Sequence, residues 1–182
     1  MVFNIAFSGS MVSGKTTAAN YAREKHPESV VLSFADPIYE IARKYWGMAH
    51  KDRDLLIFIG ESWRKRSPTI WVDIMLREII KYNEQGLSVF IDDLRLPAEF
   101  DALVENGVHM VRLNISEQEQ VKRLKENYPE TYEEHLKKTL HETETALEDT
   151  NLKWSNWFAH DLTMHMTQKS IDTIINGLNK QK

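Results

Sequence analysis

Residues 9–16 of the chain read GSMVSGKT and match the pattern G-x-x-x-x-G-K-[ST]. An apolar run at residues 3–7 precedes this stretch, and residues 14–25 have the pattern of a helix. Glycines allow such a loop to curl until its backbone N–H groups face inward, and the positive end of the helix dipole adds to its attraction for an anion. The stretch therefore predicts a loop that binds the phosphates of a nucleotide.

Individual side chains of this loop have predicted roles. Lys15 is placed to reach the β- and γ-phosphates of ATP, and the hydroxyl of Thr16 is a ligand for magnesium. The residues expected to bind ATP are Gly9, Ser10, Ser13, Gly14, Lys15, Thr16 and Thr17. The predicted cofactors are ATP and Mg2+, but the loop does not identify the molecule that accepts the phosphate.

Short apolar runs alternate with helical patterns along the rest of the chain, which is typical of a parallel sheet covered by helices. Strands are expected at residues 3–7, 30–34, 87–91 and 109–115 and within 157–166. Helices are expected at 14–25, from a cap at Asp36 to a stop at Gly47, and at 52–59, 68–81, 97–105 and 171–178, with two more that begin near 116 and 131. The prediction is a three-layer α/β fold with about five parallel strands, forming a single domain over residues 1–182.

Composition excludes several classes of protein. The chain has 182 residues, a formal net charge of −4 and no cysteine, so disulfides and thiolate metal sites are excluded. The negative charge argues against binding nucleic acid, and no apolar segment has the length of a signal peptide or a membrane span. We therefore expect a cytoplasmic protein that acts on small-molecule nucleotides, without nucleic-acid or membrane partners. Whether it forms a homodimer stays open.

Charged residues follow the expected strands at the edge where a parallel sheet binds its ligands. Asp36 follows the second strand, Asp92 and Asp93 follow the third, and Arg112 lies near the end of the fourth. Adjacent strand residues face opposite sides, so we expect one of the two acids to hold magnesium, directly or through water. Asp93 is favoured because it is nearer the tip of the strand. The alternative is that these acids only cap turns and helices.

Two further basic features are candidates for binding a phosphate. Arg95 suits a bidentate grip on a phosphate, and its alternative is a surface ion pair with Glu99. Residues 63–66 read WRKR, which fits a cradle for the acceptor with an aromatic ring for stacking, or a solvated loop. The sequence leaves both interpretations of this cluster open.

Taken in order, four landmarks resemble the phage-type deoxynucleoside monophosphate kinases, relatives of phosphomevalonate kinase among the P-loop kinases. They are the loop at residues 9–17, FADP at 34–37, the run Asp93-x-Arg95-x-Pro97-x-Glu99, and His141-x-Thr-Glu144. The resemblance implies a P-loop kinase fold with a helical lid at about residues 126–144. It also implies ATP-dependent phosphorylation of a deoxynucleoside monophosphate and suggests a phage origin.

The resemblance also assigns residues to the two substrates. Asp36, Arg64, Arg66 and Glu144 would belong to the acceptor pocket, and Arg95 would lie between donor and acceptor. Related kinases carry arginines in the lid, but this chain has none after Arg123. Either Arg112 and Arg123 neutralise the transferred phosphoryl group from the base of the lid, or lysines of the lid do so. The predicted catalytic set is therefore Lys15, Asp93, Arg95 and Arg123.

Two other functions are compatible with the sequence. The first is a kinase of the same fold with another acceptor, such as a phosphorylated mevalonate or a sugar. A hydroxyl acceptor needs a carboxylate to take its proton, and Asp36 could be that base. The second is a nucleotide-dependent switch or binding module, although residues 1–182 show no second domain that it could move.

Overall fold

The computed structural model describes residues 2–139, 145–148, 152–159 and 161–180. Its centre is a parallel sheet in which the strands lie in the order β2-β3-β1-β4-β5. The strands are β1 (Asn4–Ser8), β2 (Ser29–Leu32), β3 (Ser88–Leu94), β4 (His109–Arg112) and β5 (Asn156–Trp157). The predicted α/β class and the five parallel strands are confirmed.

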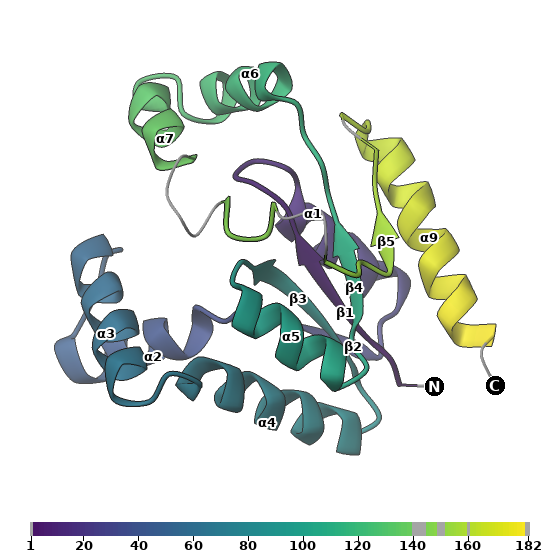
Figure 1. Ribbon diagram of the computed structural model, residues 1–182, viewed down its shortest axis with the longest axis horizontal. Helices are drawn as coiled ribbons and strands as arrows, with labels where there is room; N and C mark the ends of the chain where they lie inside the picture. The colour runs from purple at the N-terminus through teal and green to yellow at the C-terminus, as the bar shows by residue number, and fades with distance from the viewer. Residues whose placement is uncertain (1, 140–144, 149–151, 160, 181–182) are drawn as a thin grey trace.

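Helices cover both faces of the sheet (Figure 1). Helices α1 (Lys15–Lys25) and α9 (Met164–Lys180) pack on one face, where a core forms around Phe7, Phe90 and Ile171. Helices α4 (Ile70–Glu84) and α5 (Pro97–Glu105) cover the other face, where Trp71 and Ile91 are buried. Side chains of successive strand residues alternate between the two cores, as the pleat requires.

The remaining helices lie around the carboxyl ends of the strands, where Figure 1 shows two groups of helices facing each other. Helices α2 (Asp36–Trp46) and α3 (Arg53–Arg66) form one group, beyond the edge strand β2. Helices α6 (Glu117–Asn127) and α7 (Tyr132–Thr139) form the other, and the region expected to be the lid, at about residues 126–144, begins at the end of α6 and includes α7. The last part of that region, residues 140–144, lies outside the described residues.

Helix α3 is longer than predicted because Gly60 does not end it. A Cβ placed on Gly60 would lie 3.5 Å from Ile38 of α2, which is an ordinary van der Waals contact. The carbonyl of Gly60 also accepts a hydrogen bond from the indole N–H of Trp71, at 3.0 Å. The WRKR cluster is therefore the last turn of a helix and not a loop.

Helix α2 also begins differently from the prediction. Asp36 is the first residue of the helix, and Ala35 is the N-cap. The Asp36 carboxylate instead accepts a hydrogen bond from the backbone N–H of Ser33, at 2.8 Å, and so closes the turn that precedes the helix. Among the described residues, no helix is both long and apolar enough to cross a membrane.

Candidate functional site

The loop between β1 and α1 has the backbone shape that a phosphate-binding loop needs. Gly9 and Gly14 have φ angles of 152° and 100°, which side-chain-bearing residues rarely adopt. A Cβ on Gly9 would also overlap the carbonyl oxygen of Leu113 and the hydroxyl of Ser13. The glycine predicted from the motif is therefore required both by its φ angle and by the close approach of β4.

Lys15 folds back over this loop. Its Nζ donates hydrogen bonds to the carbonyls of Gly9, at 2.5 Å, and Ser10, at 3.0 Å, and the residue is 8% exposed. Burial, together with the charges of Arg95 and Arg112, lowers the pKa of Lys15 to about 7. Positive charge thus gathers around Lys15, which forms no ion pair within the described residues, and this suits an incoming anion.

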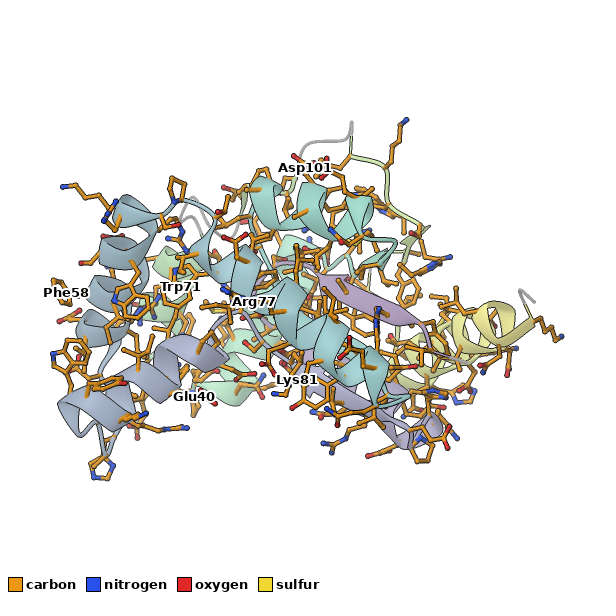
Figure 2. The ribbon with its side chains drawn as sticks, turned by 90° about the horizontal axis from the view of Figure 1, so that it is seen from below. Glu40, Phe58, Trp71, Arg77, Lys81 and Asp101 are labelled. Atoms are coloured by element: carbon orange, nitrogen blue, oxygen red, sulfur yellow. The ribbon has the colours of Figure 1, made fainter. Side chains whose placement is uncertain are left out.

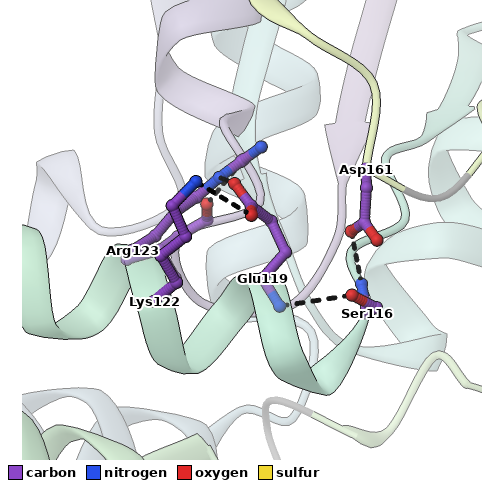
Figure 3. Close-up of polar contacts among 6 residues, drawn as sticks. Ser116, Glu119, Lys122, Arg123 and Asp161 are labelled. Atoms are coloured by element: carbon purple, nitrogen blue, oxygen red, sulfur yellow. Dashed lines mark hydrogen bonds and ion pairs between the residues drawn. The ribbon is translucent and has the colours of Figure 1, made fainter.

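Helix α6 holds the tip of the loop in place (Figure 3). Gln120 donates to the carbonyl of Met11 at 3.0 Å, and Arg123 donates to the carbonyl of Val12 at 3.3 Å. Arg123 is itself oriented by Glu119, at 2.9 Å. Sequence reasoning singled out Arg123 but missed Gln120, because a Gln on an amphipathic helix gives no signal of a partner more than 100 residues away.

A cavity of about 390 Å³ opens beside the loop, between α1, α6 and α9. Its lining includes Ser13, Gly14 and Thr17 from the loop and Arg123 from α6. Among the described residues, the buried Ser13 hydroxyl has no hydrogen-bond partner. A buried hydroxyl without a partner is costly, so this position fits a ligand that supplies one.

The acids at the end of β3 lie at an irregularity in the sheet. The pairing of β1 with β3 shifts between Ala6 and Ser8, so that one extra residue is accommodated on β3 near Asp92 and Asp93. Both charges raise the pKa of Lys15, so both acids lie near it. The simple alternation of sides used in the prediction therefore does not separate them.

Asp93 is engaged in holding a turn. Its carboxylate accepts hydrogen bonds from the hydroxyl of Ser33 at 2.5 Å and from the backbone N–H groups of Phe34 and Ala35 at 2.7 and 3.1 Å. Burial raises the pKa of Asp93, and these hydrogen bonds oppose that rise. In the described part of the chain, Asp92 has no such partner. This geometry weighs against Asp93 as the acid that binds magnesium and favours Asp92.

A second cavity, of about 260 Å³, shares no lining residue with the first, and the charges of two of its lining residues, Asp93 and Arg95, act on Lys15. It is lined by Arg64 of α3, Trp71 of α4, and Asp93, Arg95 and Glu99 around the end of β3. The structure therefore brings together two of the arginines predicted for the acceptor, from positions 31 residues apart. Arg66 is exposed and does not line this cavity. Glu144 lies outside the described residues.

Asp36 lines a groove of about 600 Å³ between α2 and α4. Phe34 and Trp71 line both this groove and the cavity of the two arginines, but Asp36 lines only the groove. Figure 2 shows Glu40 and Lys81 on the two helices that border this groove. Burial, together with the charges of Asp92 and Glu40, raises the pKa of Asp36. The structure thus does not place Asp36 in the same cavity as Arg64 and Arg95.

Arg112 is buried at the junction of β1 and β4. It is 6% exposed, donates to the Ser8 hydroxyl at 3.1 Å and lies 5.7 Å from the ring of Trp154. It lines neither of the two cavities next to Lys15. Its charge still acts on Lys15, so Arg112 adds to the positive potential of the loop.

Comparison with known proteins adds two partial sequence relatives. No family model matches the chain, so the resemblance to the phage-type kinases stays a prediction. The uncharacterized protein ORF77 of Ictalurid herpesvirus 1 (strain Auburn) is 32% identical over 111 residues, which are 59% of this chain and 48% of that protein. An adenylate kinase of Pyrobaculum aerophilum is 40% identical over 40 residues, 22% of this chain and 20% of that enzyme. The chain spans less than half the length of either relative.

Solved structures resemble the whole chain. TT1252 from Thermus thermophilus has a TM-score of 0.60 at 17% identity, with 97% of this chain and 98% of that chain covered. Shikimate kinase from Acinetobacter baumannii has a TM-score of 0.55 at 17% identity, with 100% and 97% covered. At these identities the likeness shows a shared fold. The predicted α/β fold of the P-loop kinases is therefore confirmed, and the reaction is argued from the site.

Proposed function

We propose that the protein transfers the γ-phosphoryl group of ATP to a deoxynucleoside monophosphate. The observation that carries this proposal is the position of the arginine pair. Arg64 and Arg95 line one cavity, and the charge of Arg95 acts directly on Lys15 of the phosphate loop. Two guanidinium groups suit an acceptor that already carries a phosphate. A phosphate held there would lie next to the donor phosphates, as in-line transfer requires.

Side-chain oxygens near the phosphate loop are suited to binding magnesium. Thr16 is exposed at the start of α1, and Asp92 has no hydrogen-bond partner among the described residues. The described residues contain no cluster of three acids or histidines able to hold a metal unaided. This suits magnesium, which is commonly bound by one or two protein oxygens together with phosphates and water. Thr16 and Asp92 would hold it, and the ion would neutralise charge on the donor phosphates.

The chain's own groups then serve positioning and charge neutralisation. The loop N–H groups and Lys15 hold the donor, while Arg64 and Arg95 hold the acceptor phosphate. An oxygen of that phosphate attacks the γ-phosphorus as the bond to the β–γ bridging oxygen breaks, and ADP leaves. A phosphate oxygen is already deprotonated at neutral pH, so this transfer needs no general base.

The main alternative is a hydroxyl acceptor, because one structure with the same fold is a shikimate kinase. That reaction would require a base near the γ-phosphate, and Asp36 is the residue predicted for that role. Asp36 lines the groove between α2 and α4 and does not line the cavity of Arg64 and Arg95. This position supports an acceptor that carries a phosphate. The 40-residue likeness to an adenylate kinase agrees with an acceptor of the nucleoside monophosphate class.

The test is to follow labelled phosphate from ATP to product. The protein is incubated with magnesium, γ-labelled ATP and, separately, each deoxynucleoside monophosphate, shikimate and gluconate, and the products are separated by chromatography. We expect label in a deoxynucleoside diphosphate. Asp36→Asn should keep a near-normal kcat with that acceptor. Label only in a sugar or shikimate product, lost in Asp36→Asn, would overturn the assignment of the acceptor.

A further inference from the structure

Two acidic residues among the described ones, Asp93 and Glu99, line the cavity of the two arginines, and Glu99 does not take part in the turn after β2. It is 7% exposed, although it lies only two residues into α5. One of its oxygens, Oε2, accepts hydrogen bonds from the backbone N–H groups of Arg95 and Leu96, both at 3.0 Å. Glu99 therefore holds the backbone of Arg95 in place, and this backbone sets the direction of the Arg95 side chain.

The charges that face Glu99 come from three elements. Asp93 at the end of β3 raises its pKa, and Arg64 of α3 lowers it. Arg95, in the turn between β3 and α5, lines the same cavity. Burial is the largest influence, and the pKa of Glu99 rises to about 7. At neutral pH this carboxyl group is close to half protonated.

Protonation does not break the contacts that Glu99 makes. A neutral carboxyl group keeps a carbonyl oxygen that can still accept from both N–H groups, and it gains an O–H donor on its other oxygen. Among the described residues, no hydrogen bond is made to Oε1, so this oxygen is available to carry the proton. The neutral form can thus support the same turn and offer one more donor to the cavity.

An anionic acceptor would change the balance between the two forms. A phosphate between Arg64 and Arg95 would neutralise the positive charge that now favours the Glu99 carboxylate. It would also place negative charge close to that carboxylate, which disfavours the ionised form further. We propose that Glu99 is a proton-linked positioning residue, which takes up a proton when a phosphate-bearing acceptor enters the cavity and so matches the charge of the site to its ligand.

This inference rests on the proposed function, because it requires an acceptor that carries a phosphate. It adds that the pH dependence of acceptor binding has its origin in one buried carboxyl group. A neutral acceptor would leave Arg64 paired electrostatically with Glu99 and would take up no proton. Proton uptake on binding therefore shows whether the acceptor is anionic or neutral, without a measurement of turnover.

The test is isothermal titration calorimetry with saturating ADP and magnesium at about pH 7, in buffers of different ionisation enthalpy. The probe is each deoxynucleoside monophosphate in turn, with inorganic phosphate as the minimal anion. Glu99→Gln keeps an oxygen that accepts from the two N–H groups and removes the titration. Glu105→Gln, exposed near the end of the same helix, is the matched control. Titration of the ligand phosphate itself is common to all three proteins and cancels in the comparison.

We expect the wild type and Glu105→Gln to take up as much as about half a proton more than Glu99→Gln, as a group with a pKa near 7 allows. Glu99→Gln should bind the acceptor several-fold more tightly at pH 8, since it carries no negative charge, while its affinity for ADP stays unchanged. Equal proton uptake in all three proteins would overturn the inference. If ADP binds but no phosphate-bearing probe does, the proposed acceptor class fails and this inference fails with it. If ADP does not bind either, the donor assignment is also at fault.

Discussion

The phosphate loop and the cavity of the two arginines are formed in different ways. The loop, the proposed donor site, is one continuous stretch of backbone shaped by positive φ angles at Gly9 and Gly14. The cavity proposed for the acceptor is formed by residues of separate elements, with Arg64 on α3, Trp71 on α4 and Arg95 after β3. A loop of backbone N–H groups can bind the phosphates of any nucleotide in the same way, whereas side chains from separate elements can be exchanged to change the acceptor. This difference explains how one fold can serve kinases of several acceptors.

The largest expected effect is on the donor side. Lys15→Ala removes the amino group that folds back over the loop, and we expect kcat to fall by about 10²–10³-fold, as for the loss of a preorganised charge donor. Steady-state kinetics with ATP as the varied substrate measures this. Lys65→Ala, exposed on α3, is the control and should keep wild-type rates. Comparable loss in both proteins would mean that the effect is general and not due to the loop.

Loss of an arginine from the cavity proposed for the acceptor should raise the KM for the acceptor. Arg64→Met removes one guanidinium from the cavity, and we expect the acceptor KM to rise by about 10–100-fold, in line with the loss of a charge-assisted hydrogen bond. The KM for ATP should change less than about twofold, because Arg64 does not line the donor cavity. Arg66→Met, on the same helix turn but exposed, should leave both constants unchanged. An equal rise in the two KM values would contradict the division of the site into two halves.

Asp92 and Asp93, the two adjacent acids of β3, are expected to have different roles. Asp92→Asn should raise the magnesium concentration needed for half-maximal activity by about tenfold, because it weakens a carboxylate ligand of the ion. Asp93→Asn should lower the free energy of unfolding by about 1–3 kcal/mol, since an amide cannot accept all three hydrogen bonds of the Ser33–Ala35 turn. Magnesium titrations and urea unfolding of both variants separate these effects. If Asp93→Asn raised the magnesium requirement and Asp92→Asn lowered the free energy of unfolding, Asp93 would be the magnesium ligand.

The smallest effect concerns pH and stability. The pKa of Glu99 is about 7 in the folded protein and 4.5 in the unfolded chain, so the folded state binds this proton more tightly. The stabilisation is fully present below pH 4.5 and is lost as the pH rises through about 7. Relative to the wild type, Glu99→Gln should therefore gain about 1–3 kcal/mol of unfolding free energy between acidic pH and pH 8. Urea unfolding across this range measures the gain, and a constant difference would show that Glu99 titrates normally.

The sequence predicts the donor half well because its signals are local. The loop motif fixes its own backbone, and the strand before it and the helix after it lie within residues 4–25. The fold class follows for the same reason, since each strand and most helices show their own periodicity and caps. Gly60 is an exception, because α3 continues through it and its contacts with α2 and Trp71 are not visible in the local sequence.

The acceptor half was predictable only in part. Arg64 and Arg95 were found by charge and resemblance, but the sequence could not show that Arg66 points elsewhere or that Asp36 lines another groove. These outcomes depend on how α2, α3 and α4 pack together. The expectation that only one of Asp92 and Asp93 faces the metal rested on strand alternation, which the irregular pairing of β1 and β3 interrupts, and the preference for Asp93 rested on its place nearer the strand tip. Gln120 and Glu99 act through backbone groups, which carry no sequence signal of their own.

The most direct test of the central claim is ADP release from ATP and magnesium, measured for the wild type with and without each deoxynucleoside monophosphate. The account predicts that at least one of them stimulates release strongly over the no-acceptor rate, and that Arg64→Met needs far more of it for the same rate. Release that no deoxynucleoside monophosphate changes, in a protein that still binds ATP, would contradict the claim that the two cavities serve one transfer reaction.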